Sequence, residues 1–240
     1  MQRKRFRHLF FALAVLLLMQ LFLPRLFGVF LDMPPSKDEL LGFPDKLPAH
    51  LPLGSLLGTA LATLATAIVA IKLWWRESVW ELSVNGKDAV RLTMAGLIAA
   101  AALAIFNTAF DSLDKLLLPE PTLIEEVFRS YARAAVKSNA IAPFMFWMVL
   151  LAPVAEELFF RGVIYRVSKE YMPVALAALF SAAIFAMFHV HPRMMLPVFV
   201  GGIIFAYLYE RTKALLPCMV AHSVVNFISA LQLFREGGLA

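Results

Sequence analysis

Charged residues are scarce in this sequence of 240 residues, and cysteine is nearly absent. Asp, Glu, Lys and Arg make up 16% of the chain and hydrophobic residues 61%. A soluble domain has about 25% charged and roughly 45–50% apolar residues. This composition excludes a water-soluble globular protein. The single cysteine, Cys218, excludes an intramolecular disulfide and the zinc sites that are built on paired cysteines.

Basic tracts interleaved with aromatic residues are also missing outside the N-terminus. The net charge of +5 therefore does not indicate a nucleic-acid partner. Long apolar runs dominate instead, each long enough to cross or nearly cross about 30 Å of hydrocarbon. They predict an all-α fold, a polytopic transmembrane bundle of about seven helices, because an open sheet leaves backbone groups unpaired in lipid. The runs lie at residues 9–30, 51–75, 90–110, 140–166, 173–190, 194–210 and 214–234.

The connections between these runs predict how the chain is oriented. Residues 31–50 contain four prolines and indicate an irregular loop. Residues 111–138 mix leucines with charges, which predicts an amphipathic helix at the membrane interface. With the basic N-terminus in the cytoplasm, the cytoplasmic side receives 12 Lys and Arg and the opposite side 8. This bias predicts an integral protein of the cell membrane with a cytoplasmic N-terminus.

Almost every unusual polar residue lies in the last four runs. This predicts two parts: residues 1–139, with N-terminal transmembrane helices and loops of unassigned role, and residues 140–234, a four-helix core that carries the chemistry. In the first run of the core, three charges interrupt an apolar segment. Each charge near the bilayer centre costs about 2.5–3.5 kcal/mol on insertion scales, so these residues need an explanation. They are Glu156, Glu157 and Arg161.

The spacing of these charges predicts different roles for the two glutamates. Glu157 and Arg161 are four residues apart with the acid first, the order that favours an ion pair on one helix face. Glu156 is rotated by about 100° from Glu157, which leaves it facing another partner. Pro153 removes a helical hydrogen bond one turn earlier and predicts a kink. An ion pair that only fixes helix packing is the alternative interpretation.

Two later runs carry histidines and an amide at helical spacing. Phe185 and His189 are four residues apart, as are His222 and Asn226. Each pair alone has a structural explanation, as an interfacial histidine or as polar contacts between helices. Together with Glu156, they supply groups that deprotonate a water and groups that donate hydrogen bonds to an oxyanion. The combination predicts peptide hydrolysis.

These residues resemble three ordered motifs of the CPBP intramembrane proteases, the group of the CAAX prenyl endopeptidases and the bacteriocin-processing, Abi-like proteins. The resemblance implies an intramembrane endopeptidase. Its substrate would be a membrane-associated peptide or protein, cleaved at a CAAX-type, leader or C-terminal segment. The motifs are Glu156-Glu157-x-x-x-Arg161, Phe185-x-x-x-His189 and His222-x-x-x-Asn226.

The same resemblance implies a role for each motif residue. Glu156 would activate the hydrolytic water with His189, and His222 and Asn226 would form the oxyanion hole. The remaining motif residues would support the site; they are Glu157, Arg161 and Phe185.

The residues do not decide between a metal-free and a zinc-dependent mechanism, and they allow two functions other than proteolysis. We favour a metal-free glutamate protease without a cofactor. A metalloprotease with zinc on Glu156, His189 and His222 is the alternative, although no His-Glu-x-x-His motif occurs. A thiol dyad of Cys218 with His222 is disfavoured, because buried cysteines are commonly inert.

The expected partners are a peptide or protein substrate, lipidated or not, and the lipid bilayer. The rival functions are a noncatalytic membrane scaffold or bacteriocin-immunity factor, and ion or proton transport.

Overall fold

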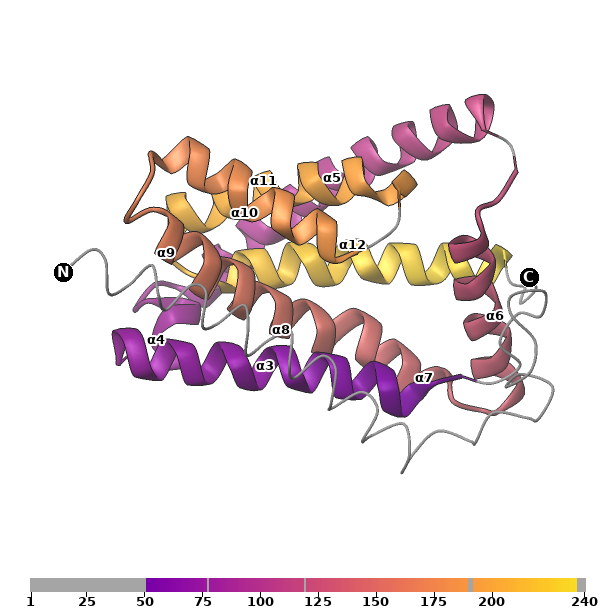
Figure 1. Cartoon of the computed structure of the whole chain (residues 1–240), viewed down its shortest axis with the longest axis horizontal. Helices are drawn as coiled ribbons and strands as arrows, with labels where there is room; N and C mark the ends of the chain where they lie inside the picture. Colours follow the sequence, from indigo (N-terminus) through magenta and orange to yellow (C-terminus); the bar gives the residue numbers. More distant parts are fainter. Residues whose placement is uncertain (1–50, 77, 119, 190–191, 237–240) are drawn as a thin grey trace.

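The computed structural model describes residues 51–76, 78–118, 120–189 and 192–236, and every element in these ranges is helical (Figure 1). The predicted all-α bundle is confirmed. The first predicted run and the loop after it lie outside the described residues. The elements are α3 (Leu53–Trp75), α4 (Val79–Val84), α5 (Ala89–Leu117), α6 (Leu123–Lys137), α7 (Ile141–Met145), the π-helix η1 (Phe146–Leu151), α8 (Ala152–Phe159), the π-helix η2 (Phe160–Tyr165), α9 (Arg166–Ser168), α10 (Val174–Phe188), α11 (Pro192–Thr212) and α12 (Leu216–Phe234).

Within the residues that the structure describes, five helical segments are long and apolar enough to cross a membrane, which fits an integral membrane protein. The helix α10 runs along the same bundle but has only 15 residues, or about 22 Å of helix. It is therefore shorter than the hydrocarbon layer. Pro173 precedes α10 and Pro192 begins α11, so a proline bounds the short helix on each side. The five segments are Leu53–Trp75, Ala89–Leu117, Ile141–Ser168, Arg193–Thr212 and Leu216–Phe234.

The helices run between two ends of the bundle, which we name the α4 end and the α6 end after the short helices found there (Figure 1). At the α4 end α3 finishes, α10 begins and α11 turns into α12. The basic residues that were expected in cytoplasmic loops gather at this end. They are Lys72, Arg76, Lys87, Arg91, Arg166, Lys169, Arg211 and Lys213. The side of the membrane on which this end lies stays a prediction.

The helix α6 is the amphipathic helix expected within residues 111–138. It begins with a capping box, in which Thr122 accepts a hydrogen bond from the backbone N–H of Glu125 and the Glu125 carboxylate accepts one from that of Thr122. The segment before α6 differs from the prediction. Residues 111–117 were expected in the connection, but they form the last turns of α5, which continues to Leu117. No glycine or proline occurs between Gly96 and Pro119, and the residue before a proline disfavours the helical conformation.

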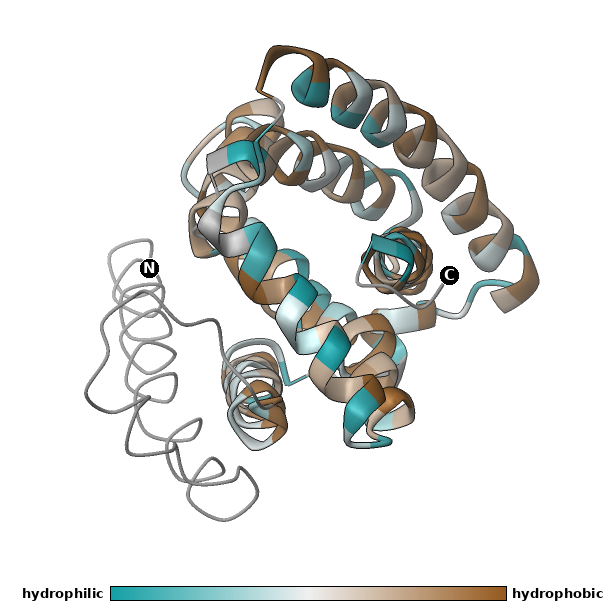
Figure 2. Cartoon of the chain, turned by 90° about the vertical axis from the view of Figure 1, so that its right-hand side faces the viewer, coloured by the Kyte–Doolittle hydropathy of each residue, from teal (hydrophilic) through white to brown (hydrophobic). Residues whose placement is uncertain are grey.

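The helix α6 lies across one end of the bundle, and Figure 2 shows hydrophilic and hydrophobic residues alternating along it. Its inner face packs Ala132 and Ala135 against Phe144 of α7 and Phe234 of α12. This small apolar cluster is separate from the main core of the bundle. The helix is therefore held to the bundle by packing as well as by its charges.

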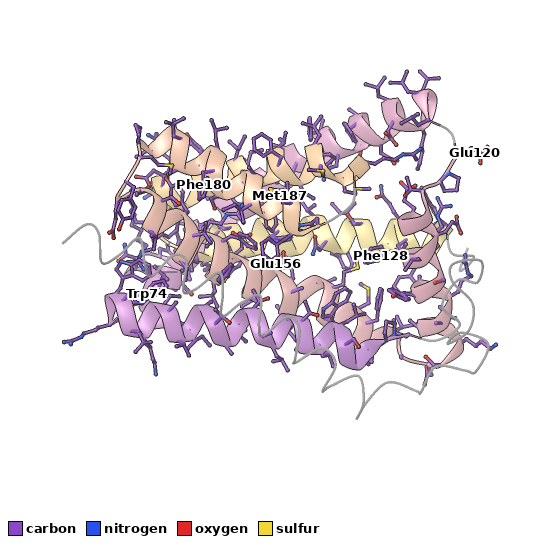
Figure 3. The ribbon with its side chains drawn as sticks, viewed as in Figure 1. Trp74, Glu120, Phe128, Glu156, Phe180 and Met187 are labelled. Carbon is purple, nitrogen blue, oxygen red and sulfur yellow. The ribbon has the colours of Figure 1, made fainter. Side chains whose placement is uncertain are left out.

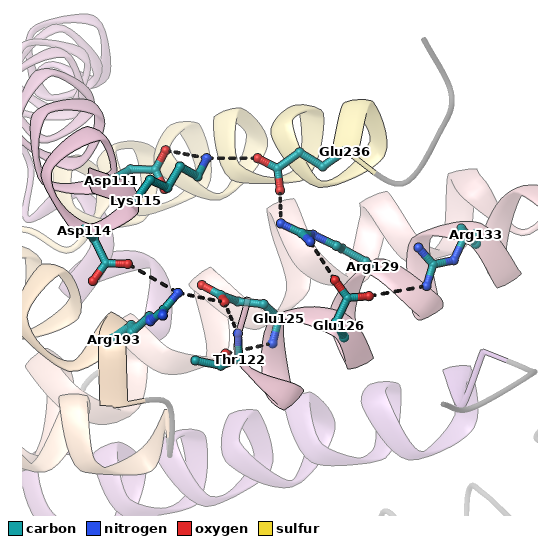
Figure 4. A network of polar contacts seen from close by, with 10 residues as sticks. All are labelled: Asp111, Asp114, Lys115, Thr122, Glu125, Glu126, Arg129, Arg133, Arg193 and Glu236. Carbon is teal, nitrogen blue, oxygen red and sulfur yellow. Dashed lines mark hydrogen bonds and ion pairs between the residues drawn. The ribbon is translucent and has the colours of Figure 1, made fainter. Parts of the chain in front are cut away.

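Ion pairs tie α6 to the end of α5 and to the residues that follow α12 (Figure 4). Glu236 accepts hydrogen bonds from Lys115 at 3.1 Å and from Arg129 at 2.9 Å. Arg129 also donates to Glu126 at 2.6 Å. Burial disfavours the charged form of Glu236, but the hydrogen bonds from Lys115 and Arg129 outweigh it and hold the pKa of Glu236 below its usual value. Glu236 is thus anionic at neutral pH and joins the two cations.

Close approach between helices depends on glycine at two positions. A Cβ on Gly202 of α11 would lie 2.8 Å from the Cβ of Ala182 on α10, and one on Gly96 of α5 would lie 2.6 Å from the carbonyl oxygen of Pro217 on α12. Neither position has room for a side chain. A Cβ on Gly201, by contrast, would have its nearest neighbour at 3.8 Å, an ordinary contact.

We expect Gly202→Ala to destabilise the protein, because the new methyl group overlaps Ala182 and forces α10 and α11 apart. The loss should be about 1–3 kcal/mol, seen as a lower melting temperature of the detergent-solubilised protein. Gly201→Ala is the matched control, the same change one residue away. It should melt at or slightly above the wild-type temperature, because alanine favours a helix over glycine. Equal melting temperatures for the two variants would contradict the close contact.

Candidate active site

The segment that carries the two glutamates alternates between α-helix and π-helix. The helix α8 has eight residues and lies between η1 and η2. Pro153 has no N–H for the carbonyl of Val149, and the N–H of Ala152 bonds five residues back to the carbonyl of Trp147, as in a π-helix. The disturbance predicted at Pro153 therefore takes the form of a π-helical turn before it.

Glu157 and Arg161 form the predicted ion pair, and both side chains are completely buried. Nη1 of Arg161 donates to Oε1 of Glu157 at 2.8 Å, and Nη2 donates to the carbonyl oxygen of Gly202 on α11 at 2.9 Å. The guanidinium also lies over two aromatic rings, 4.6 Å from the centroid of Phe185 and 5.1 Å from that of Phe205, an arrangement that favours a cation. One cation thus contacts side chains or backbone from three segments of the bundle.

His222 of α12 lies between the two glutamates. Its Nδ1 is 3.0 Å from Oε1 of Glu157, and its Nε2 is 3.8 Å from Oε2 of Glu156. Since an ionised carboxylate only accepts hydrogen bonds, we assign the bridging hydrogen to Nδ1, which leaves Nε2 toward Glu156. Phe205 stacks on the imidazole with centroids 5.2 Å apart, and Phe185 meets it edge-on at 5.7 Å. These contacts fix the orientation of the ring.

Glu156 points away from the buried pair, as its rotation along the helix predicts. Its side chain is 26% exposed, whereas that of Glu157 is not exposed at all. Figure 3 shows Glu156 near the middle of the bundle, between Trp74 toward the α4 end and Phe128 toward the α6 end. A partly open carboxylate beside a fixed imidazole is an arrangement suited to acid–base chemistry on a water.

The other two predicted site residues lie beside this cluster, each bonded to a backbone carbonyl. His189 follows the last residue of α10 and is exposed; its Nδ1 lies 2.9 Å from the carbonyl oxygen of Phe185. Its ring also contacts the ring of Phe185, with centroids 4.7 Å apart. Asn226 donates from Nδ2 to the carbonyl oxygen of Met148 in η1 at 2.9 Å. Phe185 thus connects His189 to the cluster.

The three side chains considered for zinc do not form a three-ligand site as they are arranged. Glu156 and His222 approach each other, but Nδ1 of His222 faces Glu157 and His189 bonds its own helix. Within residues 51–236, as far as the structure describes them, no three His, Cys, Asp or Glu side chains are grouped as a metal ion requires.

Several groups that contact the site residues could not be identified from the sequence pattern. Phe205 is one of many apolar residues in its helix, and nothing in the pattern distinguishes it from residues that face lipid. The carbonyl groups of Gly202 and Met148 act through the backbone, which every residue has. Cys218 is buried, and its thiol donates to the carbonyl oxygen of Phe205 at 3.2 Å, which agrees with a packing role.

Comparison with known families identifies one match, over residues 138–228, to the family described as Type II CAAX prenyl endopeptidase Rce1-like. No curated protein and no solved structure matches the chain. The matched segment includes every residue of the cluster described above. It confirms the resemblance to the CPBP intramembrane proteases that the three motifs indicated, whereas α3, α5 and α6 lie outside it.

We expect Arg161→Met to destabilise the protein strongly, because it leaves the carboxylate of Glu157 buried without its cation. Breaking a buried pair on one side costs about 3–5 kcal/mol, measurable as a loss of unfolding free energy in detergent micelles. The double variant Arg161→Met/Glu157→Gln removes the unpaired charge and should recover part of that loss. A double variant no more stable than Arg161→Met would show that the ion pair is not the source of the effect.

Proposed function

Because residues 138–228 match the Rce1-like type II CAAX prenyl endopeptidases, we propose that this chain is an integral membrane endopeptidase that cleaves a membrane-associated peptide or protein. The observation that carries the proposal is the approach of Nε2 of His222 to Oε2 of Glu156, at 3.8 Å, where a fixed imidazole meets a partly exposed carboxylate. The proposed substrate carries a CAAX-type, leader or C-terminal segment, lipidated or not. The proposed location is the cell membrane with the α4 end in the cytoplasm, which the basic residues at that end support.

In this proposal Glu156 is the general base. Its carboxylate takes a proton from a water as the water oxygen attacks the carbonyl carbon of the peptide bond, and the protonated acid then delivers the proton to the leaving amine. His189 is the second hydrogen-bond partner of that water. It reaches the water after its side chain turns away from the carbonyl of Phe185, since catalytic hydrogen bonds are often poorly aligned in a substrate-free site and tighten only when substrate binds.

His222 and Asn226 are the proposed donors to the oxyanion. Nδ1–H of His222 is held by Glu157. In the proposed step Nε2 carries a second proton, taken from solvent before the attack and kept throughout, and the adjacent carboxylate of Glu157 balances this imidazolium. The amide of Asn226 has two hydrogens. One bonds the carbonyl of Met148 and sets the orientation of the amide, and the second is directed at the oxyanion. Donors arranged in advance stabilise the charge that develops in the transition state.

We expect Glu156→Gln to abolish cleavage while the protein stays folded, because the amide keeps the shape of the side chain but is not a base. The loss in rate should be about 10²–10⁴-fold, the contribution of a positioned general base. Precursors that accumulate in the membrane peptidome of cells with Glu156→Gln identify a substrate, which is then tested with purified protein. Glu120→Gln, at an exposed glutamate of the α6 end, is the matched control and should cleave normally.

A wild-type rate for purified Glu156→Gln would overturn the assignment of the base. A cellular phenotype that survives this substitution in folded protein would favour the rival function, a noncatalytic scaffold or immunity factor that keeps the polar cluster for folding or partner binding.

Chelation tests whether the reaction needs a metal. In the proposed mechanism Glu156 and His189 activate the water without a metal, so purified protein treated with a chelator should cleave at the untreated rate. The measurement is the cleavage rate before chelation, after it, and after zinc is added back. Loss of activity that zinc restores would overturn the metal-free mechanism.

A further inference from the structure

Arg193, near the start of α11, contacts three segments at the α6 end (Figure 4). Its Nη1 is 3.3 Å from Oε2 of Glu125 in α6 and 3.6 Å from Oδ2 of Asp114 in α5. Its Nη2 donates to the carbonyl oxygen of Glu120, between these helices, at 2.7 Å. The side chain is only 15% exposed. The guanidinium is therefore held by two carboxylates and a backbone carbonyl in a mostly buried position.

The acidic partner in α6 is itself fixed. The Glu125 carboxylate that binds Arg193 also accepts a hydrogen bond from the backbone N–H of Thr122 at 2.5 Å, as part of the capping box. Its position is therefore set by the start of α6, whose inner face packs on the bundle. Arg193 is bound to a rigid element rather than to a freely moving side chain.

The chain connection between Arg193 and His189 is short. His189 directly follows α10, and α11 begins at Pro192. Consecutive Cα atoms are 3.8 Å apart, so the Cα atoms of His189 and Arg193 are separated by at most about 15 Å. Holding Arg193 in place consequently restricts where the end of α10, and His189 with it, can lie.

The position of His189 depends on how the end of α10 is held more than the positions of the other proposed site residues do. Glu157, Arg161 and His222 are buried and contacted from several sides. His189 is exposed, and in the described part of the chain its hydrogen bond is to the carbonyl of Phe185 in its own helix. Phe188, the last residue of α10, packs edge-on against Phe160 of η2, so the helix end itself rests on the bundle. The ring and hydrogen-bond contacts of the His189 side chain, in the described part of the chain, are with Phe185 alone.

We propose that Arg193, held by Asp114 and Glu125, is a positioning residue for His189. This inference rests on the proposed function. It extends the site beyond residues 138–228, which match the family, to the end of α5 and the start of α6. The ion pairs at the α6 end thereby contribute to catalysis as well as to helix packing.

The test is a kinetic comparison of variants at this position with the verified substrate. Arg193→Met keeps the aliphatic stem and removes the charge; kcat of the folded protein should fall roughly ten- to hundredfold, as expected when a catalytic group is displaced by about 1 Å, while KM stays close to wild type. Arg193→Lys keeps the charge and should recover part of kcat. Arg133→Met is the matched control, because Arg133 is 45% exposed and pairs with Glu126 of its own helix at 3.9 Å; its kcat should be unchanged.

A wild-type kcat for Arg193→Met would overturn the proposal. So would a fall in rate that follows the loss of folded protein, because this indicates a structural role alone. If Arg193→Met does not fold, Asp114→Asn replaces it. This variant keeps the contacts of Arg193 with Glu125 and Glu120 and should lower kcat by a smaller factor without changing KM, and an unchanged kcat would again overturn the proposal.

Failure of this inference is distinguishable from failure of the proposed function. If Glu156→Gln is inactive and Arg193→Met cleaves normally, the function stands and the positioning role is wrong. If Glu156→Gln cleaves at the wild-type rate, the assignment of the base is wrong. If wild-type protein cleaves no membrane-associated peptide or protein, the proposed function itself is wrong.

Discussion

The buried guanidinium of Arg161 is the interaction on which the arrangement of the helices and of the site depends. Removing a charged group from water costs several kcal/mol unless partners replace the water. Here the partners are Glu157 in its own helix, the carbonyl of Gly202 on α11, and the rings of Phe185 on α10 and Phe205 on α11. The cation therefore has all of these partners only when three segments are packed together, and the absence of a side chain at Gly202 permits the close approach.

The same ion pair determines how the imidazole of His222 is presented. Oε1 of Glu157 accepts from both Arg161 and Nδ1 of His222, so the carboxylate that compensates the cation also fixes the orientation of the ring. The neighbouring residue, Glu156, is rotated out of this pair and keeps part of its exposure. Adjacent glutamates on one helix thus take a buried and a partly exposed position, because successive residues of a helix point about 100° apart.

The predicted division at residues 139 and 140 stays a prediction, while the packing of the bundle crosses that position. Leu103 of α5 belongs to the same buried core as Phe159 of α8, and Arg193 of α11 is held by carboxylates of α5 and α6. The segment that matches the protease family is thus surrounded by helices outside the match.

Local patterns in the sequence determined the helical class, most helix limits, the ion pair of Glu157 with Arg161 and the separate direction of Glu156. All of these follow from the 3.6-residue period of a single helix and from the scarcity of charge. Only the tertiary structure decided that His222 lies between the two glutamates, that a glycine carbonyl binds the guanidinium, and that His189 bonds its own helix. These are contacts between helices. They depend on how each helix is rotated and shifted against its neighbours. The 3.6-residue period of a single helix does not determine that placement.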